Sequence, residues 1–68
     1  MSSDRADYSG MTTNERLYAS GLVDQFDLAA KSRNRDTMIH ILLQVNIPAA
    51  DAASIANKIL AAPSMYGY

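Results

Sequence analysis

Apolar side chains recur at helical spacing in three consecutive stretches of the chain. In the first stretch, residues 13 to 31, one face at about 100° per residue is apolar, and it consists of Tyr18, Ala19, Leu22, Val23, Phe26, Ala29 and Ala30. Thr12 and Glu15 have the spacing of a capping box, in which each side chain bonds to the other residue's backbone N–H. The pattern therefore predicts a helix from about 13 to 31, with Gly21 in its interior at a cost of ~1 kcal/mol relative to alanine.

The second stretch, from about 37 to 45, is apolar around more than half of its circumference, because only His40 and Gln44 are left for water. A helix of this kind needs neighbours on two sides, so we expect it to be the central element. Before it, Asn34 is expected in the left-handed conformation, and Asp36 is expected to cap the helix.

The turn between the second and third stretches is predicted at Asn46, which tolerates the left-handed conformation, with Ile47 folding back onto the preceding helix. A third helix follows from about 49 to 61, where one face is apolar and consists of Ala52, Ile55, Ala56, Ile59 and Leu60. Pro63 ends this helix, because proline lacks the N–H that a helix interior needs. The residues after Pro63 are too few for another element, but we expect Tyr66 to lie against the bundle.

These patterns predict an all-α protein, a small three-helix bundle with a flexible N-terminal segment and a short aromatic tail. The N-terminal segment, residues 1–11, is polar and has no periodicity, so ordering it is not repaid by buried surface. The other residues, 12–68, form a single domain, because a chain of 68 residues is too short for two cores. Such a small domain has a thin core and a stability of only a few kcal/mol.

The composition narrows the chemistry that this domain can support. The chain has no cysteine and one histidine, which excludes disulfides and thiolate metal sites and leaves no zinc-held core, so we expect no metal and no cofactor. The formal net charge of −1 gives no field that would attract nucleic acid or an anionic membrane. Because the N-terminal residues lack the apolar run of a signal peptide and no span of about 18 apolar residues occurs, we expect a cytoplasmic protein with no membrane partner.

His40 is the only side chain whose ordinary pKa lies near neutrality, and Asp36 stands four residues before it. No serine, cysteine or lysine lies at a helical spacing at which His40 would act as its base. A bundle of this size also has no room for an enclosed pocket. We therefore expect no catalytic residue, no enzymatic activity and no small-molecule substrate.

Lys31, Arg33 and Arg35 place three positive charges within five residues at the first interhelical turn. Positive side chains are favoured at the C-terminal end of a helix, where the helix dipole is negative. This structural role is sufficient to explain why the three charges occur at the turn. The alternative is a phosphate-contacting cluster in a small nucleic-acid-binding regulator. Against this alternative, the outward face of the third helix offers only Asp51, Ser54, Asn57 and Lys58, whereas a DNA-recognition helix is polar and basic outward.

A second narrow stripe on the first predicted helix lies away from its main apolar face and consists of Leu17, Gly21 and Leu28, with Asp24 among them. Two leucines around a glycine suit the docking of another helix, from a protein partner or from a second copy of the chain. Alternatively, the tail covers the stripe through Met65, Tyr66 and Tyr68. The first explanation favours a non-enzymatic interaction or self-association module that uses Leu17, Gly21, Leu28, Tyr66 and Tyr68.

Three segments together resemble a group of short bacterial, chiefly proteobacterial, helical proteins of unknown function. These segments are Asn14-Glu15-Arg16-Leu17, the stretch from Leu22 to Phe26, and Ile59-Leu60-Ala61-Ala62-Pro63 with the following Tyr66-Gly67-Tyr68. The resemblance covers residues 14–68. It implies a bacterial, cytoplasmic setting and assigns no functional residue.

Overall fold

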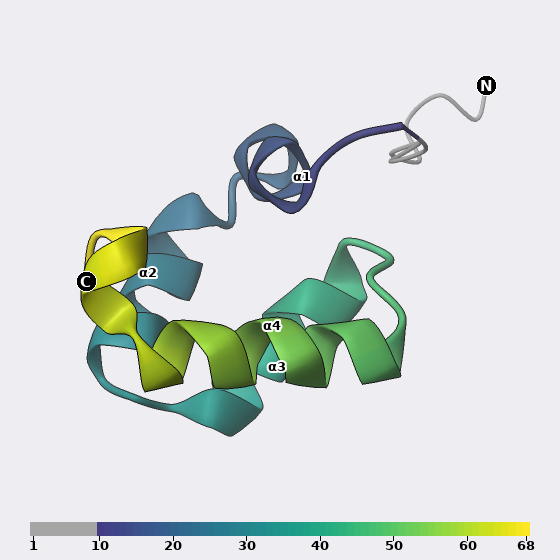
Figure 1. The fold of residues 1–68 in the computed structure, drawn as a ribbon. Coiled ribbons are helices and arrows are strands. Elements are labelled where there is room, and N and C mark those ends of the chain that lie inside the picture. The colour runs from purple at the N-terminus through teal and green to yellow at the C-terminus, as the bar shows by residue number, and fades with distance from the viewer. Residues whose placement is uncertain (1–9) are drawn as a thin grey trace, which may run out of the picture.

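The computed structural model describes residues 10–68, and the described chain is helical throughout, without a strand (Figure 1). Its elements are α1 (Thr13–Ser20), α2 (Val23–Lys31), α3 (Arg35–Gln44), α4 (Ala49–Ala61) and the short 3-10 helix η2 (Pro63–Tyr66). The all-α prediction is confirmed. The prediction of three helices is wrong, because the first stretch forms two helices and the tail forms a 3-10 turn. The expected flexible segment, residues 1–11, lies mostly outside the described residues.

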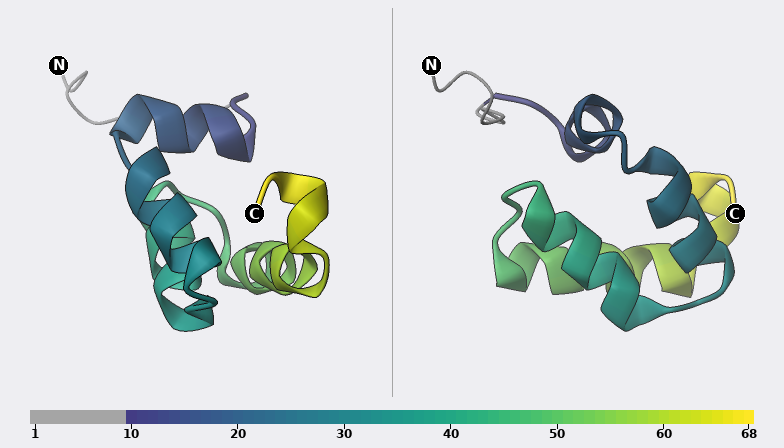
Figure 2. Two further views of the ribbon diagram at one scale, coloured as in Figure 1. Left: turned by 90° about the vertical axis from the view of Figure 1, so that its left-hand side faces the viewer. Right: turned by 180° about the vertical axis from the view of Figure 1, so that it is seen from behind.

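The first stretch breaks at Gly21, which has a φ of 76° and ends α1. The N–H of Gly21 donates to the carbonyl of Tyr18, and the N–H of Leu22 donates to the carbonyl of Leu17 at 3.0 Å. Figure 2 shows α2 turning away from the axis of α1 at this point. The turn changes which side chains face inward: Leu17 is only 3% exposed, whereas Tyr18 is 82% exposed. The expected position of Tyr18 and Ala19 on the buried face is therefore wrong.

The helix caps in the structure match the sequence-based predictions at Thr12 and Asn46 and differ from them between α2 and α3. Thr12 and Glu15 form the predicted capping box, with N···O distances of 2.8 and 3.2 Å. Asn46 has a φ of 65° and takes the predicted left-handed conformation. Between α2 and α3, however, Arg33 is the left-handed residue, with a φ of 58°. Asn34 rather than Asp36 caps α3, because its side-chain oxygen accepts from the N–H of Thr37.

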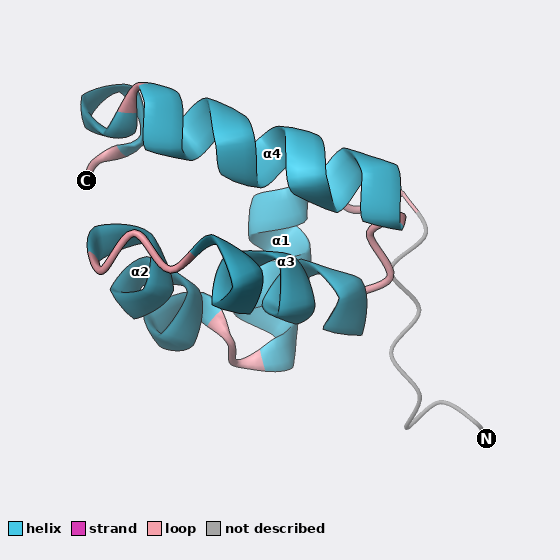
Figure 3. Cartoon of the chain, turned by 90° about the horizontal axis from the view of Figure 1, so that it is seen from below, coloured by secondary structure: helices cyan, strands magenta, loops and turns pink. Residues whose placement is uncertain are grey.

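The core forms where α3 packs against both α2 and α4, which makes α3 the central element as predicted (Figure 3). Its largest fully buried side chains are Met38, Leu42 and Val45. Ile47 folds back into the same core and is 8% exposed. Only His40 and Gln44 of this stretch were expected to face water, but Leu43 is also exposed, at 43%.

The position of α1 depends on Arg16, which connects this helix to the end of α3. Its Nη1 donates to the carbonyls of Val45 and Asn46, both at 3.1 Å, and its Nε donates to the carbonyl of Met11. Because the last carbonyls of a helix have no partner within the helix, a guanidinium at this point satisfies them. α1 otherwise packs chiefly against α2, and this arrangement leaves an opening between α1 and α4.

None of the helices in residues 10–68 combines the length and the apolar character that a membrane crossing requires.

Candidate functional site

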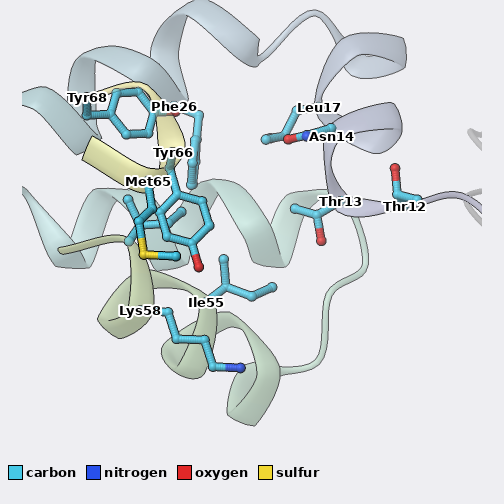
Figure 4. Close-up of a pocket in the computed structure, with 11 residues that line it drawn as sticks. Thr12, Thr13, Asn14, Leu17, Phe26, Ile55, Lys58, Met65, Tyr66 and Tyr68 are labelled. Carbon is cyan, nitrogen blue, oxygen red and sulfur yellow. The ribbon is translucent and has the colours of Figure 1, made fainter. Parts of the chain in front are cut away.

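An open groove of about 580 Å³ lies between α1, α4 and η2 (Figure 4). We call it the apolar groove. Its inner surface is the edge of the core, formed by Leu17, Phe26 and Ile59, which are all at least nine-tenths buried. At its rim, Met65 is 78% exposed and Tyr66 is 47% exposed. The groove therefore continues the core to the surface and presents apolar side chains to water.

The polar lining of the apolar groove comes from α4 and from the start of α1. Figure 4 shows Thr13 and Leu17 on the α1 side, with Ile55 and Lys58 on the α4 side. Lys58 is the charged side chain of the lining, and it is exposed. Within the described part of the chain its ammonium group has no hydrogen-bond or ion-pair partner. A carboxylate entering the groove would find a free cation there.

Tyr68 fixes the tail that forms one wall of the groove. Its hydroxyl donates to Oδ1 of Asp27 on α2 at 2.5 Å, and its backbone N–H donates to the carbonyl of Pro63 at 3.0 Å. Burial raises the pKa of the Tyr68 hydroxyl to about 12, and the hydrogen bond to Asp27 and its negative charge act in the same direction. The tail is therefore joined to α2 as well as to α4, and Tyr68, more than Tyr66, lies against the bundle.

The structure separates the residues of the predicted stripe. Leu17 is part of the core, Gly21 is an exposed turn residue, and Leu28 is 67% exposed on α2. Leu28 lines a different, shallower hollow of about 370 Å³, which also includes His40. The continuous stripe is thus wrong, because it assumed one straight helix through Gly21. The tail residues Met65, Tyr66 and Tyr68 line the apolar groove together with Leu17, while Leu28 stays uncovered.

Two of the three basic side chains at the turn between α2 and α3 form hydrogen bonds with α4. Nη2 of Arg33 donates to the carbonyl of Leu60 at the end of α4, at 3.2 Å, and Nε of Arg35 donates to Oδ1 of Asn57 at 2.7 Å. Of the three predicted residues, Lys31 is left without a described partner. Two of the three cations are therefore already bonded to α4, so the nucleic-acid alternative gains no observation in its favour.

The sequence pattern did not identify Ile55 and Lys58 as surface residues of a site. Ile55 was assigned to the inward face of its helix and Lys58 to the solvated face, yet both line the apolar groove. Their spacing of three residues at the edge of the apolar face is a weak signal that would have placed them together. In residues 10–68 no group of three or more histidine, cysteine or acidic side chains is arranged as a metal site.

No protein-family model, curated protein or solved structure matches this chain. The resemblance to short proteobacterial proteins therefore stays a prediction.

Proposed function

We propose that the chain is a small, non-enzymatic module for protein–protein interaction or self-association, and that the apolar groove is its binding surface. The observation that carries the proposal is the open edge of the core beside Met65 and Tyr66, which are 78% and 47% exposed. The proposal includes a cytoplasmic location in a bacterial cell, which rests on the sequence alone.

Covering the exposed apolar side chains of the groove would supply the free energy of binding. Covering a large apolar side chain stabilises a complex by about 1.5–3 kcal/mol when it passes fully from water to a protein environment. Met65 can adapt its shape to a partner, and Tyr66 offers a large ring with a polar end, as residues at interaction hot spots often do. A groove between two helices is also the usual receptor for an amphipathic helix.

The chemistry of the groove supports binding rather than catalysis. Its lining contains threonine, asparagine, lysine and tyrosine, but His40 and the acidic side chains lie outside it. A general acid–base pair or an activated nucleophile requires two such groups within hydrogen-bond reach. The described groove residues do not form such a pair.

Site-specific photo-crosslinking in the native cell tests the proposal. A photoreactive amino acid is placed at Met65, on the rim of the groove, and in a matched control at Tyr18, which is 82% exposed on α1 and does not line the groove. We expect a discrete protein adduct from position 65 and none from position 18. The absence of any intermolecular protein adduct at position 65, with the variant folded, would contradict the proposed function.

A further inference from the structure

The side of α4 that borders the apolar groove carries an ordered set of three side chains: an acid, an apolar residue and a base. Asp51, Ile55 and Lys58 are spaced by four and three residues, which places them within an arc of about 60° on the helix surface. Asp51 and Lys58 are exposed, while Ile55 is partly buried and lines the groove with Lys58. This set is called the α4 stripe below.

The two charges of the α4 stripe have no partner within the described chain. Seven residues of helix separate Asp51 from Lys58 by ~10 Å along the axis, which is too far for them to pair with each other. Neither side chain has a hydrogen bond or ion pair with another described residue. Both charges are therefore available to a second molecule.

We propose that the occupant of the apolar groove is a second copy of this chain, with the two α4 helices antiparallel about a two-fold axis near Ile55. This inference rests on the proposed function of the groove. The midpoint of Asp51 and Lys58 falls beside Ile55, so antiparallel helices bring each Asp51 opposite the Lys58 of the other copy. The two Ile55 side chains then meet at the centre. Parallel helices would instead place like charges opposite each other.

The surroundings of the α4 stripe suit this arrangement. α1 packs chiefly against α2. The face of α4 that carries Ile55 and Lys58 is therefore open along the groove. Met65 and Tyr66 extend the apolar surface at the end of α4, where the start of the second copy's α4 would lie. Because a two-fold axis repeats every contact away from the axis, the ion pair between Asp51 and Lys58 occurs twice, once on each side of the central Ile55 contact.

Charge reversal tests the register of the two helices. Sedimentation velocity is measured for the wild type, for Asp51→Lys, for Lys58→Asp and for an equimolar mixture of the two variants. The wild type is expected to be a dimer. Each variant alone brings two pairs of like charges together and should weaken the dimer by about tenfold or more. In the mixture, residue 51 of each variant meets an opposite charge at residue 58 of the other, so a heterodimer is expected.

Asp36→Lys and Lys31→Asp serve as matched controls. They reverse the same charges at the first turn of α3 and the last turn of α2, where both residues are exposed and lie outside the groove. Both control variants should dimerise like the wild type. None of the four substitutions touches the core, so all the variants are expected to fold. Thermal unfolding of each variant checks this.

The outcomes separate this inference from the proposed function. A monomeric wild type whose position 65 crosslinks to a different protein overturns the inference and leaves the proposed function standing. The antiparallel register is overturned if both charge-reversal variants dimerise as strongly as the wild type. It is also overturned if the mixture of the two variants forms no heterodimer. An adduct of monomer mass that joins position 65 to residues 1–9 of the same chain overturns the second copy as occupant. The absence of any protein adduct at position 65 removes both proposals.

Discussion

The side chains of Arg16 and Tyr68 attach the two ends of the described chain to its central helices. Arg16 donates to two carbonyls at the end of α3, and Tyr68 donates to Asp27 on α2. Hydrogen bonds in which one partner is ionised are stronger than those between neutral groups. These contacts, together with the burial of Leu17 in the core, hold the walls of the apolar groove in place.

Replacing Tyr68 by phenylalanine should change how stability depends on pH. The pKa of Tyr68 is about 12 in the folded chain and near 10 in the unfolded chain, so the folded state holds the proton more tightly. The contribution of the hydroxyl to the free energy of unfolding is complete below about pH 10 and is lost as the pH rises toward 12. Urea unfolding at a series of pH values should therefore show a steeper decline for the wild type than for Tyr68→Phe. Parallel curves for the two proteins would contradict this assignment.

At the scale of elements, α1, α2, α3 and η2 all end in the same backbone motif. In each, a residue with positive φ is followed by one whose N–H donates to the carbonyl five residues earlier; the bonds are Leu22 to Leu17, Asn34 to Ala29, Ile47 to Leu42 and Tyr68 to Pro63. This is the hydrogen bond of the Schellman motif, which satisfies a carbonyl that the helix leaves free. The repeated motif explains how so short a chain reverses direction several times without long loops.

The change in the free energy of unfolding caused by Gly21→Ala has one sign if Gly21 lies at a helix end and the opposite sign if it lies inside a helix. In an interior, alanine would stabilise the helix by ~1 kcal/mol. At a φ of 76°, with no other atom within 4 Å of an added Cβ, the substitution strains the backbone alone and should destabilise the protein by about 1 kcal/mol. Urea unfolding measures the change, and Gly21→Asn, in which the new residue tolerates the left-handed conformation better than alanine does, serves as the comparison. A more stable Gly21→Ala protein would restore the continuous helix.

The sequence predicted the elements whose ends carry their own chemical signal. The bounds of α4 and the capping box at Thr12 were confirmed, because proline and a paired threonine and glutamate act within one turn. The break at Gly21 was missed because Leu22 and Phe26 continue the apolar spacing across it. The left-handed residue before α3 was misplaced because Asn34 has the higher intrinsic preference, whereas its side chain is used to cap α3 and Arg33 takes the strained conformation.

On the scale of the whole molecule, the core is thin and contains many alanines. The fully enclosed large side chains are Met38, Leu42 and Val45, and around them Ala29, Ala30, Ala52 and Ala56 allow the helices to approach closely. Domains of this size rarely gain more than about 3–5 kcal/mol from a single core. Each large core side chain therefore supplies a substantial part of the stability.

Leu17 and Leu28 should differ sharply when each is replaced by alanine, although the sequence placed them on one surface. Leu17 is 3% exposed, so Leu17→Ala should cost about 2–4 kcal/mol, enough to leave much of the protein unfolded. Leu28 is 67% exposed, so Leu28→Ala should stay within about 0.5 kcal/mol of the wild type. Chemical denaturation followed by circular dichroism measures both. Equal effects from the two substitutions would contradict the burial of Leu17.

The apolar groove could not be predicted from the sequence, because it depends on contacts between distant residues. Arg16 reaches carbonyls 29 and 30 residues later in the chain, and Tyr68 reaches Asp27 across 41 residues. Periodicity describes one helix at a time and does not record which helices leave space between them. The sequence pattern pointed to a contact between the tail and Leu17, but only the folded structure places Ile55 and Lys58 beside them.

The groove takes its walls from opposite ends of the described chain, since Leu17 belongs to α1 and Met65 to η2. Most other helix contacts join α2, α3 and α4, which are close in sequence and close their loops at a small entropic cost. We therefore expect the groove to form late in folding, after the central helices have assembled. A chain shortened at either end would lose one wall of the apolar groove, and a chain that lacks α1 would also lose the buried Leu17 from the core.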